Sequence, residues 1–343
     1  MIAKRNLLKS AACALAILAA GTLGAGSVEA QTTFKMALGD AAGGTQDAAG
    51  KKFAEELGSL TDGQVKVQMF HNGQLGSEQD TVNDAAMGLL DFSVLAINNI
   101  TPFSPTVGVL TLPYMMLSLD DAVKLTQGEI GQQLVENTIE DAGVRIIAWS
   151  YAGFRVLSNS KHPVKTVEDL QDLVIRVPKN EIMIATYQSW GNNPTPMAWS
   201  ETFAALQQGV VDGQDTPYIT IYAMNFQEVQ KYITELRYLF LLEPIVISEQ
   251  IFQEQSEDVQ QAILDAGKAA TEYSAQYLTE TEASIKQKLT DAGMQIDEPA
   301  DDEKAFIDAA TNAVWPQFYD SVGGKEKVDE ALTALGRESP VKE

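Results

Sequence analysis

Arginine is the rare residue type whose context suggests binding chemistry in this chain. Only five arginines follow residue 30, although the chain carries 47 aspartates and glutamates. Arg176 lies inside the apolar segment 173–178 (LVIRVP), and burying an unpaired guanidinium there is costly. Its side chain therefore either faces a cleft, where its planar fork suits a carboxylate, or forms an internal salt bridge. Arg155, which follows Gly-Phe, is a weaker instance of the same pattern, and both alternatives stay open.

An aromatic residue and an amide pair are further candidates. Trp199 follows the segment 194–198 (PTPMA), whose two prolines fix the backbone. It forms either the aromatic wall of a pocket or part of the core. Asn98 and Asn99 follow a predicted strand and offer neutral donors and acceptors that can read hydroxyl groups.

Residues for nucleophilic or metal-dependent catalysis are scarce. The single cysteine, Cys13, and two histidines cannot form a Cys/His zinc site. His71 lies beside an Asn-Gly turn and His162 precedes a proline, so we interpret both as surface or turn residues. No Gly-x-Ser-x-Gly, Walker or dinucleotide-binding motif occurs. We predict no cofactor and no metal, although the abundant carboxylates leave a secreted hydrolase with a carboxylate pair as an alternative.

Length and composition narrow the classes of protein. The chain has 343 residues, of which 45% are hydrophobic, and this excludes a disordered chain and favours two domains. A formal net charge of −23 argues against a nucleic-acid or anionic-membrane partner, because phosphate contacts need clustered lysine and arginine.

The first thirty residues have the pattern of a secretory signal peptide. Lys4, Arg5 and Lys9 precede an apolar run at 11–23, and a Val-Glu-Ala sequence ends at Ala30. Cleavage after Ala30 removes the only cysteine, three basic residues and one acidic residue, which changes the net charge from −23 to −25. The apolar run is too short to span a bilayer. We therefore expect an exported, soluble periplasmic protein.

Hydrophobic periodicity predicts an α/β protein. A strand at 34–38, a helix at 46–60 and a strand at 65–70 form a βαβ beginning, which favours a parallel sheet. Further expected strands are 91–96, 144–149, 174–177 and a strand-turn at 210–214; expected helices are 77–87, 119–142, 200–208 and most of the chain after 256. A second α/β unit begins near 155 without a flexible linker, so we expect the chain to cross between two lobes more than once.

Five segments together resemble one family. They are 72–76 (NGQLG), 112–114 (LPY), 169–178 (DLQDLVIRVP), 193–201 (NPTPMAWSE) and 205–214 (ALQQGVVDGQ). Their order and spacing are similar to those of the DctP-type solute-binding proteins of TRAP transporters, over about 34–335. The resemblance implies a two-lobed, class II-like periplasmic binding protein fold in which a long helix spans both lobes. It implies a monomeric binding protein, not an enzyme, that closes on a small organic anion and delivers it to a permease with two membrane subunits.

The resemblance also implies ligand-binding residues. Arg176 matches the family arginine that pairs with the ligand carboxylate, Arg155 matches a second basic position, and Trp199 matches the aromatic residue that packs on the ligand. The full predicted set is Arg176, Arg155, Trp199, Thr216, Asn98, Asn99, Glu78 and Asp215. The predicted lobes are 31–153 with 242–281, and 154–241 with 282–343. A binding protein that serves a chemoreceptor remains an alternative to transport.

Two departures from the family pattern bear on the ligand. Thr216 stands before Pro217, where relatives often have asparagine, and a hydroxyl has one donor where an amide has two. The loop 39–42 (GDAA) stands where many relatives have histidine and proline. We therefore expect a ligand other than a C4-dicarboxylate, and favour a hydroxylated monoanion such as a sugar acid or a hydroxy-sulfonate.

Overall fold

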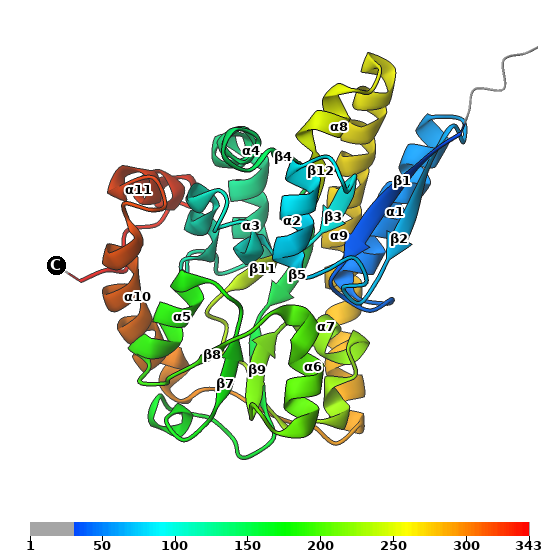
Figure 1. Ribbon diagram of the computed structural model, residues 1–343. Helices are drawn as coiled ribbons and strands as arrows, with labels where there is room; N and C mark the ends of the chain where they lie inside the picture. Colours follow the sequence, from blue (N-terminus) through cyan, green and yellow to red (C-terminus); the bar gives the residue numbers. More distant parts are fainter. Residues whose placement is uncertain (1–30, 343) are drawn as a thin grey trace, which may run out of the picture.

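The computed structural model describes residues 31–342 (Figure 1). It begins with β1 (Thr32–Leu38), α1 (Thr45–Leu60) and β2 (Val65–Phe70), and β1 pairs with β2 in parallel. The apolar face of α1 buries Ala49, Phe53 and Leu57 at helical spacing. The predicted βαβ beginning is confirmed. The predicted signal peptide and its cleavage after Ala30 lie outside the described residues.

The first sheet has the order β2-β1-β3-β12-β4. Its remaining strands are β3 (Phe92–Val94), β4 (Val144–Ala148) and β12 (Ile245–Ser248). The strand β12 arrives from much later in the chain, yet it lies between β3 and β4 and is antiparallel to both. Completion of this sheet therefore depends on a segment about one hundred residues beyond β4.

The second sheet has the order β13-β10-β6-β9-β7-β8. Its strands are β6 (Val156–Asn159), β7 (Ile175–Val177), β8 (Thr195–Pro196), β9 (Gly213–Thr216), β10 (Tyr232–Thr234) and β13 (Gln295–Asp297). A separate antiparallel pair, β5 (Tyr151–Phe154) with β11 (Phe240–Leu242), connects the two sheets. The chain leaves the first sheet through β5 and returns through β11, so the prediction of more than one crossing is correct.

Helices cover both sheets. They are α2 (Glu78–Ala86), α3 (Leu119–Gln127), α4 (Glu129–Ala142), α5 (Glu181–Ser189), α6 (Trp199–Gln208), α7 (Tyr218–Ala223), α8 (Glu249–Gln253), α10 (Lys304–Phe318) and α11 (Lys325–Ala334). Short 3-10 turns include η1 (Ile97–Asn99) and η2 (Pro105–Thr111). Ser77 caps α2 in a capping box with Asp80, as its spacing predicted.

Two predicted elements differ from the structure. The helical stretch 119–142 is two helices, because Gly128 is extended and a Cβ there would lie 2.7 Å from the carbonyl oxygen of Lys124. The strand predicted at 210–214 begins only at Gly213. The amides of Val210 and Val211 instead bond the carbonyl oxygen of Ala205 and help to end α6, so they are not free for a sheet.

The helix α9 (Glu257–Asp291) is 35 residues long, about 52 Å at 1.5 Å per residue. It packs against α1 and β4 at one end and against α7 further along, so it spans both lobes as predicted (Figure 1). Gly267 permits close packing, because a Cβ there would lie 2.0 Å from the carbonyl oxygen of Ile147. No helix within residues 31–342 is long and apolar enough to cross a membrane.

The predicted lobe boundaries fall within β5, within β11 and within α9, and they remain a prediction. The last helix, α11, packs against α3 and η2 of the N-terminal part, whereas α10 packs against α5. The C-terminal segment therefore contacts elements of both predicted lobes.

Candidate functional site

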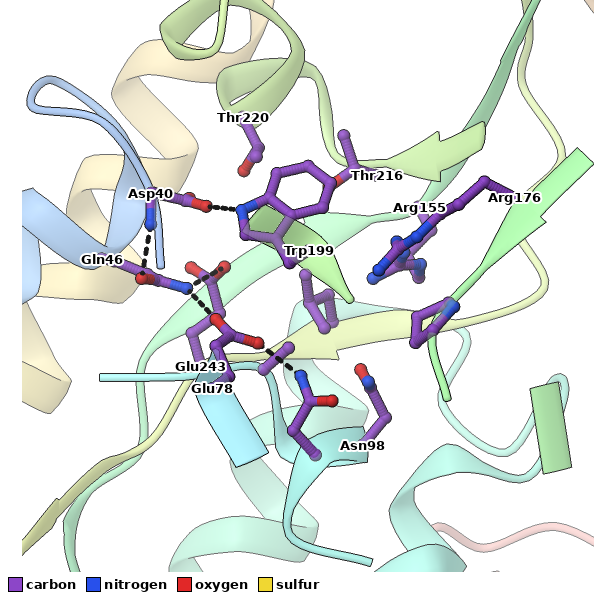
Figure 2. Close-up of a pocket in the computed structure, with 14 residues that line it drawn as sticks. Asp40, Gln46, Glu78, Asn98, Arg155, Arg176, Trp199, Thr216, Thr220 and Glu243 are labelled. Carbon is purple, nitrogen blue, oxygen red and sulfur yellow. Dashed lines mark hydrogen bonds between the residues drawn. The ribbon is translucent and has the colours of Figure 1, made fainter. Parts of the chain in front are cut away.

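A cavity lies where the two sheets meet (Figure 2). Its free volume is about 20 Å³, which is about the space of one water molecule. Its lining residues are Asp40, Gln46, Glu78, Ala96, Asn98, Asn99, Arg155, Arg176, Pro178, Trp199, Thr216, Thr220, Leu241 and Glu243. Seven of the eight residues predicted from the sequence are in this set, and Asp215 is the exception. Most of the side chains that line the cavity are polar or charged.

Arg176 is the buried cation of this cavity without an acidic partner. It is the middle residue of β7, whose neighbours Ile175 and Val177 pack into the core on the opposite face. Its Nε and Nη2 donate to the carbonyl oxygen of Met197 at 3.1 and 2.7 Å, while its Nη1 has no hydrogen-bond partner in the described part of the chain. Burial, with a contribution from Arg155, lowers the pKa of Arg176 to about 9. No salt bridge to Arg176 exists within residues 31–342, so the internal-pair alternative is not what the structure shows.

Arg155 has an acidic partner. Its Nη2 lies 2.9 Å from Oδ1 of Asp215, and the hydroxyl of Tyr238 donates to Oδ2 of the same carboxylate. Burial opposes the charge of Arg155, but the adjacent Asp215 outweighs it and raises the pKa of Arg155. Asp215 was predicted as a ligand residue; the structure places it behind Arg155, fully buried, where it holds the guanidinium in place.

Trp199 connects the two sides of the cavity. It is the first residue of α6, and its indole Nε1 donates to Oδ1 of Asp40 at 2.8 Å. Its ring lies beside Phe226, with centroids 5.5 Å apart, and the Arg176 guanidinium lies 5.4 Å from the ring centroid. Trp199 is half-buried and lines the cavity, so it packs on the core and also forms a wall.

Three carboxylates lie opposite the arginines, those of Asp40, Glu78 and Glu243 (Figure 2). All three are buried. Burial raises the pKa of each; for Glu243 it rises to about 7, and for Asp40 the neighbouring Glu243 and Glu78 raise it further. Of the three, only Glu78 was predicted. Within residues 31–342 no group of three or more acidic, histidine or cysteine side chains is arranged to hold a metal ion.

Amide and hydroxyl groups complete the lining. Asn99 donates to Glu78, whereas neither Nδ2 nor Oδ1 of the fully buried Asn98 has a hydrogen-bond partner among residues 31–342. Among the residues that the structure describes, the Thr220 hydroxyl also lacks a partner, and Thr216 lines the cavity as well. Neither histidine enters the cavity: His71 contacts Asp47 in a partly buried loop and His162 bonds the next residue. The cavity therefore offers unsatisfied polar atoms on both of its sides.

The sequence prediction missed Asp40, Gln46, Thr220 and Glu243. One signal was present for Glu243, which is the only charged residue in the apolar run 238–247 (YLFLLEPIVI). A lone ionisable residue in an apolar run was the same signal that identified Arg176. The other three lie in a loop or at a helix N-terminus, where polar residues are ordinary and carry no such signal.

Comparison with known proteins identifies the family. The family model for bacterial extracellular solute-binding protein, family 7 (DctP), matches residues 39–321. A solute-binding protein of Roseobacter denitrificans is 36% identical over 266 residues, which are 78% of this chain and 81% of the relative.

Two solved structures are similar over nearly their whole length. A TRAP periplasmic solute-binding protein of R. denitrificans with bound L-galactonate has a TM-score of 0.82 and 32% identity, covering 89% of this chain and 99% of that one. One from Polaromonas with bound D-erythronate has a TM-score of 0.84 and 27% identity, covering 91% and 99%. These proteins bind solutes and are not enzymes, so the hydrolase alternative is not supported. The chain belongs to the DctP family of TRAP periplasmic solute-binding proteins.

Proposed function

We propose that this protein captures a small organic acid by placing the acid's carboxylate on Arg176. The observation that carries this proposal is a buried guanidinium that lines the cavity and whose Nη1 has no hydrogen-bond partner within residues 31–342. A carboxylate would fill that donor position and supply the counter-charge that Arg176 lacks.

The other predicted residues take supporting roles. Arg155, fixed by Asp215, adds a second positive charge beside the carboxylate. Trp199 packs on the ligand, and Asn98, Asn99 and Thr216 read its hydroxyl groups. Because the lining residues come from both lobes, a bound ligand favours the closed arrangement of the lobes.

We further propose that the ligand is a hydroxylated acid and that the recipient is a TRAP permease. Similar proteins were solved with L-galactonate, D-erythronate and β-D-glucuronate, all of which are hydroxylated monoacids. One similar protein holds succinate, so the family alone does not fix the ligand. Membership of the TRAP family supports delivery to the two membrane subunits, and delivery to a chemoreceptor is the competing outcome.

A thermal-shift screen of the protein from residue 31 onward tests the binding proposal. The panel contains L-galactonate, D-erythronate, D-glucuronate, succinate and hydroxy-sulfonates, with galactitol as a control that has the hydroxyls of galactonate but no acid group. A ligand at about 100 times its Kd stabilises the folded protein by about 2.7 kcal/mol, which a melting curve resolves. We expect at least one acid to raise the melting temperature and galactitol to have no effect. A panel without any shift, or an equal shift with galactitol, would refute the proposal.

Uptake measurements test the delivery proposal. Deleting the two permease subunits should abolish uptake of the ligand and leave its binding to the purified protein unchanged. Uptake that persists without them would point to another recipient.

A further inference from the structure

The wall of the cavity opposite the arginines is acidic. We define this acidic wall as the carboxylates of Asp40, Glu78 and Glu243, and Figure 2 shows it facing Arg155 and Arg176 across the cavity. The exposed fractions of the three residues are 1%, 6% and 2%. Within residues 31–342, none of the three forms a salt bridge. The cavity therefore has two arginines on one side and three carboxyl groups without a cationic partner on the other.

One glutamine holds two members of the acidic wall together. The Nε2 of Gln46 donates to Oε1 of Glu78 at 2.9 Å and of Glu243 at 3.4 Å. The Oε1 of Gln46 accepts from the backbone amides of Gly39 and Asp40 at 2.8 and 3.1 Å, which fixes the orientation of this amide. The wall is thus a connected arrangement in which each acid has a defined position.

Gly39 leaves room for the Glu78 carboxylate because glycine has no side chain. A Cβ on Gly39 would lie 2.5 Å from Oε1 of Glu78, so a larger residue at 39 would displace the carboxylate. Thr45 donates to Glu243 and Asn99 donates to Glu78, which leaves the acids held by neutral donors alone. The neighbouring residues position the carboxyl groups and supply no counter-charge to them.

We propose that the acidic wall determines specificity: it accepts hydrogen bonds from hydroxyl groups at the far end of the ligand and excludes a second acid group. This inference rests on the proposed function, because the carboxylate on Arg176 sets the direction in which the ligand lies. At pH 8 an ionised carboxyl group at the far end would meet the oxygen atoms of three buried carboxyl groups that have no counter-charge, and this contact is repulsive. A hydroxyl group is a donor and meets no such penalty.

Asn98 supports this assignment independently. Its amide is fully buried and lines the same cavity, and no described residue is a hydrogen-bond partner of its Nδ2 or Oδ1. A hydroxyl group is both donor and acceptor, so it can satisfy an amide oxygen and an amide nitrogen. An ionised carboxylate can satisfy only the nitrogen and would leave Oδ1 unsatisfied.

Matched pairs of ligands test the inference by isothermal titration calorimetry at pH 8. L-galactonate is compared with galactarate, and D-erythronate with meso-tartrate. The two members of each pair share a carbon skeleton, but the far end is a hydroxymethyl group in the monoacid and a second carboxylate in the diacid. In any pair whose monoacid binds, we expect the Kd of the monoacid to be at least about 100-fold lower than the Kd of the diacid. This is the scale of a buried like-charge contact.

Acid-to-amide variants identify the groups responsible. Asp40→Asn and Glu243→Gln each replace one carboxyl group by an amide at nearly constant shape. Each should reduce the ratio of monoacid affinity to diacid affinity by at least about tenfold. Glu249→Gln is the control, because Glu249 pairs with Arg145 and does not line the cavity. It should leave the ratio unchanged.

Three results would overturn the inference. A diacid that binds as tightly as its monoacid would show that the wall does not exclude a second acid group. A ratio that stays the same in both variants would show that these carboxylates are not the determinants. If neither monoacid nor diacid of either pair binds, and the wider panel also gives no shift, the proposed function fails and the inference fails with it.

Discussion

Replacement of the two cavity arginines separates a ligand-binding cation from a structural one. Arg176→Met removes a buried guanidinium that has no acidic partner at similar side-chain length. Its pKa of about 9, compared with an ordinary 12.5, corresponds to about 5 kcal/mol at 1.36 kcal/mol per pH unit. That free energy is the cost of holding the charge in the buried site without a ligand, and a ligand carboxylate offsets part of it.

The variant should therefore lose affinity without losing stability. Truncating one member of a buried charge pair costs at least about 2 kcal/mol, or about 30-fold in Kd, which calorimetry with the best acid of the panel measures. The melting temperature of unliganded Arg176→Met should equal or exceed that of the wild type, since an unpaired buried charge is gone.

Arg155→Met is the matched comparison. It leaves Asp215 buried without its cation, which should cost about 3 to 5 kcal/mol of stability and lower the melting temperature even without ligand. Unchanged affinity of Arg176→Met, or a loss of stability as large as that of Arg155→Met, would refute the assignment of Arg176 as the ligand's counter-charge.

Three further predictions concern the opposite side of the cavity. Trp199→Phe keeps a ring but removes the hydrogen bond to Asp40, and calorimetry should show affinity weakened by about 1 kcal/mol; unchanged affinity would contradict a role for that bond. Folding raises the pKa of Glu243 from 4.5 to about 7, so the folded protein keeps a proton that the unfolded chain releases. The free energy of unfolding should therefore fall as the pH rises from about 4.5 to about 7. Denaturant titrations over this pH range should show a smaller fall in Glu243→Gln than in the wild type. An equal fall in both proteins would contradict the raised pKa of Glu243. Gly39→Ala should displace Glu78 and weaken binding while the circular dichroism spectrum stays that of the wild type; full affinity would mean that Glu78 does not need its present position.

Many individual helices and strands could be predicted from the sequence, but the way in which the strands pair into sheets was less predictable. The βαβ beginning, the Ser77 cap and the start of α9 follow from periodicity and capping, which are local properties. The strands β5, β11 and β12 were not predicted, because short strands buried on both faces have no alternating pattern. Their partners are also distant in sequence, and no local signal specifies them.

The residues of the candidate site were also only partly predictable from the sequence. Arg176 was identified because it is a charged residue within an apolar strand. Glu243 is likewise a charged residue within an apolar run, but it was not predicted. Asp215 and Thr216 are adjacent in β9, so their side chains point to opposite faces of the sheet. The sequence did not show that Asp215 pairs with Arg155 while Thr216 lines the cavity. The acidic wall itself arises only when β1, α2 and the chain returning after β11 come together.

The position of β12 has a consequence for how the protein folds. Since β12 fills the place between β3 and β4, the segment 31–153 leaves the first sheet open at its middle. Neither lobe can then reach its final structure until the chain has passed through the other lobe and come back, and such long-range pairing slows folding. The two lobes should consequently form and melt in a single cooperative transition, and neither should survive as an isolated fragment.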